Sequence, residues 1–300
     1  MLEVGIVNNM PDSALESTER QFRELIAAAA GTRGVRLTFF SIPERPRAEA
    51  GRAYVDEHYQ DIGTLPAVRL DGLIVTGAEP RTTVLSDEPY WPALTNLVDW
   101  AEEHTASTVW SCLAAHAAVL YRDGVGRERC AEKLSGVFEC EKASAHEIVS
   151  CMPSRWRMPH SRRNTLPVDA LIAAGYQMLS TSPAVGADMF LKQRKSLFFF
   201  LQGHPEYDTG ALFREYQRDV GRYLAGTSEH YPEMPEGYFD DAAAAALAVF
   251  RRRALDERNN ALLSEFPCGG SARLPAHSWG EAAARIYSNW LALLTPRAGR

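Results

Sequence analysis

Cysteine is scarce in this chain, and the cysteines that occur are poorly placed for cross-linking. There are five in 300 residues, and no two form a Cys-x-x-Cys pair. An odd number without such pairs argues against a disulfide framework and against a zinc ribbon. We therefore expect no structural metal, so each cysteine is either interior packing or a reactive thiol. The five are Cys112, Cys130, Cys140, Cys151 and Cys268.

Long hydrophobic runs and a basic charge surplus are also missing. No apolar run approaches the roughly 18–20 residues needed to cross a bilayer. The N-terminus shows no basic stretch followed by an apolar segment, which a secretory signal would have. The chain has 32 Lys and Arg residues against 38 Asp and Glu residues, which gives a net charge of −6. Proteins that bind duplex nucleic acid are usually basic. We expect a cytoplasmic protein without membrane or nucleic-acid partners.

What the chain does have is an alternation of strand-like and helix-like segments. Short apolar runs rich in β-branched residues alternate with segments of helical periodicity. Such alternation predicts an α/β fold with a mainly parallel sheet flanked by helices. Strands are expected near 2–7, 35–40, 73–78, 108–112 and 196–201, and helices near 18–30, 92–101, 113–121 and 210–224.

This pattern breaks after about residue 225. A turn-rich stretch at 231–235 leads into a segment, 240–266, whose apolar residues predict one helix with Asp240 as its N-cap. We therefore predict a catalytic α/β domain over 1–225 and a helical extension over 226–300 that packs on the same domain.

Cys112 is the first candidate catalytic residue. It stands where a predicted strand passes directly into an Ala-rich helix, the position at which α/β sheets present a nucleophile. The helix N-terminus favours the thiolate, and the backbone N–H of Leu113 would face a developing oxyanion. The alternative is an inert buried cysteine.

His204 and Glu206 follow another very apolar predicted strand. Open α/β sheets place their sites beyond the carboxyl ends of strands, so these residues are expected near Cys112. A thiol, an imidazole and a carboxylate compose a nucleophilic triad. On its own, a His-Pro-Glu sequence is equally compatible with a surface turn.

Further polar residues admit two interpretations each. Glu215 and Arg218 share a helix face, as a surface ion pair or as ligands for the charged ends of an amino acid. The basic segment 158–163, which we expect to be a loop, has the chemistry to hold an anion. Lys133 is either an anion contact or a solvated lysine.

Taken in order, these motifs resemble the homoserine O-acyltransferase family, whose members make O-succinyl- or O-acetylhomoserine for methionine biosynthesis. The most distinctive motif is Gly-His-Pro-Glu-Tyr-Asp at 203–208 with Glu-x-x-Arg-Asp at 215–219. The other matching segments, which span nearly the whole chain, are 7–11, 18–21, 71–78, 90–91, 108–118, 132–137, 159–162, 278–279 and 289–291.

The resemblance implies a flavodoxin-like, class I glutamine amidotransferase-like fold without glutaminase activity. It implies a ping-pong reaction in which Cys112 accepts the acyl group from acyl-CoA, His204 is the general base and Glu206 holds the histidine. No bound cofactor is implied, and a homodimer is suggested. Leu113, Gly77 and Ala78 would stabilise the oxyanion, and Lys133, Ser161, Glu215 and Arg218 match positions of the substrate site.

The choice of acyl group is the point at which this sequence departs from the family. The loop position that separates succinyl from acetyl donors is commonly Gly or Glu, and Arg81 aligns there. An arginine would pair with a succinyl carboxylate, which favours succinyl-CoA over acetyl-CoA.

Three alternatives stay open at this point. A serine O-acetyltransferase would keep the chemistry, because one methylene changes discrimination by only about 1–3 kcal/mol. A glutamine amidotransferase-like hydrolase would share the triad, although the cysteine lacks that family's Gly-x-Cys-x-Gly setting. The third is a binding module that has lost activity.

Overall fold

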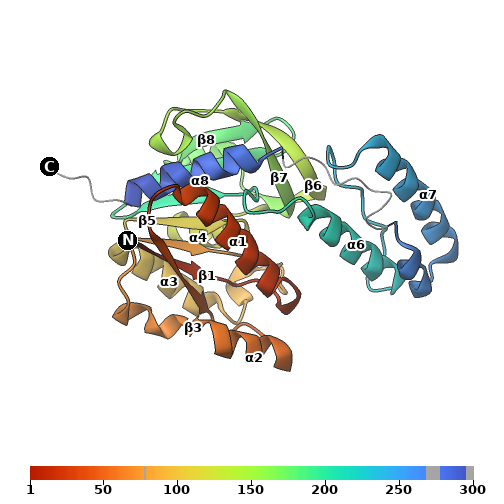
Figure 1. Ribbon diagram of the computed structural model, residues 1–300, viewed down its shortest axis with the longest axis horizontal. Helices are drawn as coiled ribbons and strands as arrows, with labels where there is room; N and C mark the ends of the chain where they lie inside the picture. The colour runs from red at the N-terminus through yellow and green to blue at the C-terminus, as the bar shows by residue number, and fades with distance from the viewer. Residues whose placement is uncertain (78, 268–277, 295–300) are drawn as a thin grey trace.

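The computed structural model describes residues 1–77, 79–267 and 278–294. One sheet of ten strands runs through this part of the chain in the order β3-β2-β1-β4-β5-β10-β9-β8-β6-β7 (Figure 1). Neighbours from β3 to β10 are parallel, and those from β10 to β7 are antiparallel. The strands are β1 (Leu2–Val7), β2 (Val35–Ser41), β3 (Gln60–Asp61), β4 (Gly72–Val75), β5 (Ser107–Ser111), β6 (Glu128–Lys142), β7 (Arg155–Thr165), β8 (Gln177–Ser182), β9 (Gly186–Gln193) and β10 (Leu197–Leu201).

Helices cover both faces of this sheet. Along β10, Phe199 packs into the core beneath α1 and α8, while Phe198 and Phe200 pack toward α3 and α4 on the other face. Successive strand residues point to opposite faces, so a strand buried on both sides reads as a continuous apolar run. The helices are α1 (Leu15–Ala30), α2 (Glu49–His58), α3 (Trp91–His104), α4 (Leu113–Asp123), α5 (Val168–Ala173), α6 (Ala211–Leu224), α7 (Asp241–Glu257) and α8 (Gly280–Leu294).

The mainly parallel α/β architecture predicted from the alternation is confirmed, but one element within it was predicted wrongly. Residues 158–163 are not a loop; they lie within β7, which pairs antiparallel with β6. Pro159 sits opposite Val137 in this pair, and its carbonyl oxygen accepts a hydrogen bond from the backbone of His204 at 2.8 Å. The strand therefore brings a basic segment beside the histidine.

The region beyond residue 225 holds a second correction. Asp240 does cap α7, since its side chain accepts a hydrogen bond from Ala243 N at 2.8 Å. The helix does not continue to residue 266, however: it ends at Glu257, and Arg258 takes a left-handed conformation with φ 37°. A short 3₁₀ helix (Asn260–Glu265) follows.

The helices beyond residue 225 pack in different places. Helix α7 shares a hydrophobic cluster with α6, and the two stand to the right of the sheet in Figure 1. Helix α8 instead returns to the sheet and lies against α1, where the rings of Phe22 and Tyr287 meet edge to face with centroids 6.5 Å apart. The division at residue 225 stays a prediction.

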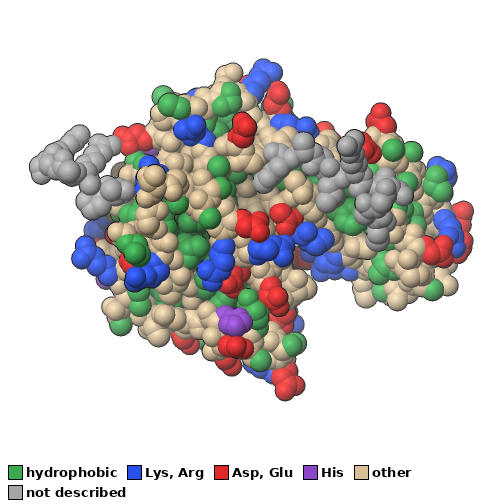
Figure 2. All heavy atoms as spheres, viewed as in Figure 1, with side chains coloured by type: hydrophobic (Ala, Val, Ile, Leu, Met, Phe, Trp, Pro, Cys, Tyr) green, Lys and Arg blue, Asp and Glu red, His purple; other side chains and the backbone are tan. Residues whose placement is uncertain are grey.

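Charges on the visible surface are mixed in sign. Figure 2 shows basic and acidic side chains interleaved across the middle of the face rather than gathered into a basic patch. Arg20 and Arg214 both contact Asp208, at 3.1 and 2.8 Å, so α1 is tied to the segment before α6. None of the helices in the described part is long and apolar enough to cross a membrane.

Candidate active site

Cys112 occupies a strained turn between β5 and α4. Its backbone has φ 50° and ψ −112°, a region that residues with a side chain rarely adopt. Its N–H donates to Leu201 O at 2.7 Å, which fastens the turn to the end of β10. The half-buried side chain is thereby held above the carboxyl edge of the sheet. Strain retained at such a turn marks a candidate functional residue.

His204 and Glu206 form the second part of the site. Both side chains are buried, and Nδ1 of His204 lies 2.8 Å from Oε1 of Glu206. Cys112 is close enough for its charge to raise the pKa of the imidazole, and Nε2 of His204 has no hydrogen-bond partner in the described part of the chain. With Nδ1 held by Glu206, the nitrogen left for the thiol is Nε2. The predicted residues therefore meet in the arrangement of a cysteine triad.

The electrostatics of the histidine favour its charged form. Burial disfavours an imidazolium, but the charges of Glu206 and of the Cys112 thiolate outweigh it, so the pKa of His204 lies well above its ordinary value. A thiolate–imidazolium pair is the reactive form of a catalytic cysteine, because the thiolate is the nucleophile.

Gly77 brings the loop after β4 against the start of α4. A Cβ on Gly77 would lie 2.5 Å from the backbone nitrogen of Ala114, so only glycine permits this approach. Leu113 is the first residue of α4, where N–H groups precede the first intrahelical hydrogen bond. Two of the three predicted oxyanion residues therefore lie beside Cys112. Ala78, the third, lies outside the described residues.

A polar cluster lies next to the triad and is centred on Glu215. The hydroxyl groups of Ser161 and Tyr207 donate to its carboxylate, and Nζ of Lys133 lies 3.2 Å from Oε2. Burial disfavours the charge, but Lys133 and the two hydroxyls hold the pKa of Glu215 below its ordinary value. Arg218 reaches the same carboxylate at 3.9 Å. The structure thus brings Lys133 and Ser161 to the Glu215–Arg218 pair, which the helical spacing had already placed on one face.

Asp219 completes this cluster, and we did not single it out from the sequence. It accepts a hydrogen bond from Lys133 Nζ at 2.8 Å and one from Arg218 Nε at 2.9 Å. The i,i+4 spacing from Glu215 was the available signal, because it places both carboxylates on one face of α6.

Tyr207 connects the cluster to the triad and was likewise missed as a site residue. Its ring stacks on the imidazole of His204 with centroids 4.3 Å apart, while its hydroxyl reaches Glu215. Its backbone oxygen accepts a hydrogen bond from the indole of Trp279 at 2.8 Å. Tyr207, three residues after His204, is therefore held both at its hydroxyl and at its backbone oxygen.

Arg81 is the one predicted residue that is not brought to this cluster. It lies in the loop between β4 and α3, with an exposed side chain, and its backbone N–H donates to Glu88 Oε1 at 2.5 Å. Its charge is felt instead by Arg45, whose pKa is lowered first by burial and in small part by Arg81.

A buried polar network lies beneath the segment that leads from β10 to His204. Nε2 of His160 is 3.2 Å from Oδ1 of Asp188, and the hydroxyl of Ser180 donates to Oδ2 at 2.6 Å. A Cβ on Gly203 would lie 2.7 Å from Asp188, so the chain passes directly over this network to reach His204. The Sγ of Cys140 also lies there, within 4.8 Å of both groups. The network fixes the approach of β10 to the site.

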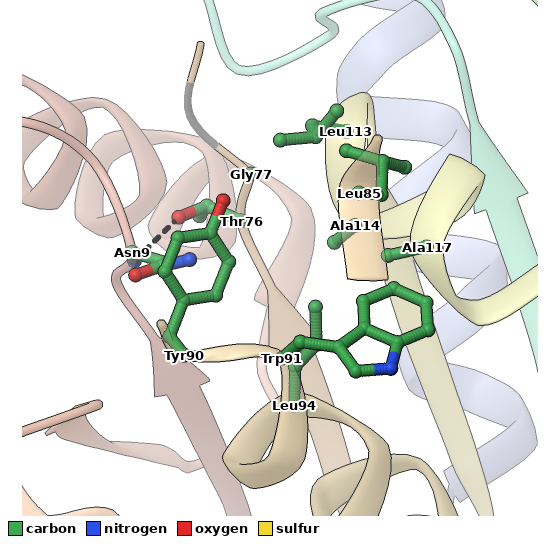
Figure 3. Close-up of a pocket in the computed structure, with 10 residues that line it drawn as sticks. All are labelled: Asn9, Thr76, Gly77, Leu85, Tyr90, Trp91, Leu94, Leu113, Ala114 and Ala117. Atoms are coloured by element: carbon green, nitrogen blue, oxygen red, sulfur yellow. Dashed lines mark hydrogen bonds between the residues drawn. The ribbon is translucent and has the colours of Figure 1, made fainter. Parts of the chain in front are cut away.

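A narrow pocket opens beside the oxyanion residues. Figure 3 shows Leu113, Ala114 and Gly77 above Tyr90 and Trp91, with the Tyr90 hydroxyl directed toward the loop after β4. This pocket lies at the carboxyl edge of the sheet, next to Cys112.

Solved structures resemble the fold at low sequence identity. A glutamine amidotransferase from Thermotoga maritima matches with a TM-score of 0.53, 14% identity and coverage of 98% of each chain. A second, from Methylobacillus flagellatus, matches with a TM-score of 0.52 and 14% identity, covering 100% of this chain and 96% of its own. The fold is accordingly of the class I glutamine amidotransferase-like type.

Sequence comparison is more specific. A protein named homoserine O-succinyltransferase from Rhodopseudomonas palustris is 47% identical over 97% of this chain and 87% of its own length. One of the same name from Methylorubrum extorquens is 46% identical over 99% of this chain and 88% of its own. The family model for homoserine O-succinyltransferase matches residues 1–297, and the chain belongs to that family.

Proposed function

We propose that the protein transfers a succinyl group from succinyl-CoA to the side-chain hydroxyl of homoserine through a thioester on Cys112. The observation that carries this proposal is the pairing of His204 with Glu206 at 2.8 Å beside a strained Cys112. Membership of the family and the names of its relatives support the acceptor and the acyl group.

In the first half-reaction the Cys112 thiolate attacks the thioester carbonyl of the donor. The N–H of Leu113 and the loop at Gly77 lie where the oxyanion would form. The carbon–sulfur bond to coenzyme A then breaks, and the imidazolium of His204 supplies the proton to the departing thiolate. The products are succinyl-Cys112 and free coenzyme A.

In the second half-reaction homoserine attacks the enzyme thioester. His204, now neutral, removes the hydroxyl proton as the new carbon–oxygen bond forms, and Cys112 leaves as a thiolate. Glu206 stabilises the imidazolium that results. The cycle ends with the thiolate–imidazolium pair restored.

The cluster around Glu215 supports an amino-acid acceptor. It presents carboxylates from Glu215 and Asp219 together with cations from Lys133 and Arg218. Arg218 retains 42% of its side-chain exposure, so its guanidinium is accessible to a substrate carboxylate. Glu215 is the natural partner of the α-ammonium group.

The decisive assay follows coenzyme A thiol release from succinyl-CoA or acetyl-CoA in the presence of homoserine. Release that depends on homoserine, is faster with succinyl-CoA, and is lost in Cys112→Ala supports the proposal. Cys151→Ala is the matched control, because Cys151 is exposed and away from the triad. No release with either donor sinks the proposal. Serine in place of homoserine tests the shorter acceptor, and light scattering tests the homodimer.

A further inference from the structure

A set of buried polar atoms lies at the point where the sheet changes its winding direction. The chain passes from β1 to β2 on one side and returns to β4 on the other, so the crevice lies beyond the ends of β1 and β4. Ligands of open α/β sheets bind in this crevice. Asn9 follows β1 and Thr76 follows β4, and the backbone N–H of Asn9 donates to the Thr76 hydroxyl at 2.9 Å (Figure 3).

Arg45 is the most unusual residue here. It is 8% exposed, and its guanidinium carbon lies 5.6 Å from the centre of the Tyr90 ring. Beyond this contact with Tyr90, its Nε and Nη1 have no hydrogen-bond partner in the described part of the chain. Buried N–H groups without acceptors cost free energy, and one held this way is a candidate ligand contact.

Arg127 approaches the same tyrosine from another segment, between α4 and β6. Its Nη2 donates to Thr83 O at 3.1 Å, but its buried Nη1 has no partner among the residues described. Burial lowers its pKa, and the neighbours that act against burial are Tyr90 and Glu88. Two arginines from distant parts of the chain thus converge on Tyr90.

The local charge is positive. Glu88 is the carboxylate acting on both arginines, and one of its oxygens already accepts hydrogen bonds from the backbone nitrogens of Arg81 and Thr82. Arg47, by contrast, is paired with Asp12 at 3.0 Å and is not available. Arg45 and Arg127 therefore supply two positive charges against the single negative charge of Glu88. This excess of positive charge suits the binding of one anion.

Tyr90, whose ring Arg45 contacts, also lines the narrow pocket beside the acyl site. Tyr90 lines it together with Gly77 and Leu113, the two residues placed beside the oxyanion position. Tyr90 therefore stands between Arg45 and the residues next to Cys112. Two methylenes separate the carbonyl of a succinyl group from its free carboxylate. The phosphates of coenzyme A lie on the opposite side of the thioester from the succinyl carboxylate.

We infer that Arg45 and Arg127 bind the free carboxylate of the succinyl group and so select a dicarboxylic acyl donor. This inference rests on the proposed function and adds two residues beyond Arg81. Arg81 is exposed, whereas Arg45 is buried and Arg127 half-buried.

The test uses succinyl-CoA and butyryl-CoA, which have the same four-carbon acyl chain with and without the carboxylate. We would measure loading of Cys112 by each donor without acceptor, following the mass of the intact protein. Arg45→Met and Arg127→Met should each lower the ratio of succinyl to butyryl loading rates about 10- to 100-fold, as expected for a charged hydrogen bond. A ratio within one preparation is insensitive to partial loss of folded protein.

Arg251→Met is the matched control. Arg251 also lies 5.6 Å over a tyrosine ring, that of Tyr231, but on α7 and paired with Glu233. Its ratio should be unchanged. If the Arg45 and Arg127 variants slow both donors equally, the arginines serve the phosphates or the fold and the inference fails, while acyl transfer stands. If the unmodified protein shows no preference for succinyl-CoA, the inference also fails. If it loads neither group, the proposed function fails and takes the inference with it.

Discussion

Tyr207 stacks its ring on the imidazole of His204 and at the same time donates its hydroxyl to Glu215. The two rings are nearly parallel, with an interplanar angle of 16°. One side chain therefore borders both the proposed general base and the carboxylate of the cluster where the acceptor is proposed to bind. Movement of Glu215 on binding an ammonium group would be transmitted to His204 through this ring.

The two contacts of Tyr207 are separable by mutation. Tyr207→Phe keeps the stacked ring and removes the hydrogen bond to Glu215, so we expect a KM for homoserine raised about 10-fold with little change in kcat. Tyr207→Ala removes both contacts and should lower kcat as well. Initial rates against homoserine concentration measure both constants. A Phe variant that loses kcat at unchanged KM would contradict the separation.

The strained turn predicts a difference between two inactive variants. Both Cys112→Ala and Cys112→Gly remove the nucleophile, but only glycine adopts φ 50° and ψ −112° without strain. We expect the Gly variant to be more stable than the Ala variant by about 1 kcal/mol, the low end of such strain. Urea unfolding of the two proteins measures the difference. An Ala variant as stable as the Gly variant would show that the turn is relaxed.

The raised pKa of His204 depends on Glu206. Because Glu206 is the foremost cause opposing burial, Glu206→Gln should move the pKa of His204 down, which an NMR titration of its ring detects. A group whose folded pKa is raised adds stability below its unfolded value, about 6.5, and loses it as pH rises through the folded pKa. The stability advantage of the unmodified protein over Glu206→Gln should therefore shrink above neutral pH. An advantage that grows with pH would refute this assignment.

His116 predicts the opposite pH dependence. It lies fully within the core on α4, one turn after Cys112, and burial lowers its pKa to about 3 although Gln202 holds Nε2 at 2.9 Å. Between about pH 6.5 and 3 the unfolded chain binds a proton that the folded chain does not, so stability falls as pH falls, by up to about 1.4 kcal/mol per unit. His116→Gln should flatten the stability curve in this range. Its NMR signal should stay constant from pH 5 to 9 while that of His204 titrates.

The sequence was sufficient to place the proposed nucleophile and the proposed base side by side, for a physical reason. Cys112 and His204 each follow an apolar strand, and strands β5 and β10 are neighbours in register, so their carboxyl ends coincide. Parallel sheets bring such ends together whatever the intervening chain does. Sequence spacing alone carried no comparable rule for Lys133 and Ser161, which meet Glu215 because β6 and β7 pair antiparallel beside α6.

Other features were fixed by contacts distant in sequence. The segment 158–163, expected as a loop, lies in β7: Pro159 cannot donate to a ladder, but its carbonyl accepts from the backbone of His204, just beyond β10. The break after Glu257 lacks a glycine; Arg258 holds the left-handed turn by stacking over Tyr223 and donating to Ser228 O at 2.8 Å. Arg45 lies between β2 and α2, where nothing in the local sequence pattern marks it as buried.

Contacts from Trp279 and from α8 hold the segment that carries His204 and Glu206. They bear on when the site forms during synthesis. The indole of Trp279 holds the carbonyl of Tyr207. Burial raises the pKa of the Tyr287 hydroxyl, and the nearby charge of Glu206 raises it further. On a ribosome, Cys112, His204 and Glu206 are all synthesised well before Trp279 and Tyr287. We therefore expect the groups that restrain His204 and Glu206 to reach their places only after Trp279 and Tyr287 have left the exit tunnel, well after Cys112 has emerged.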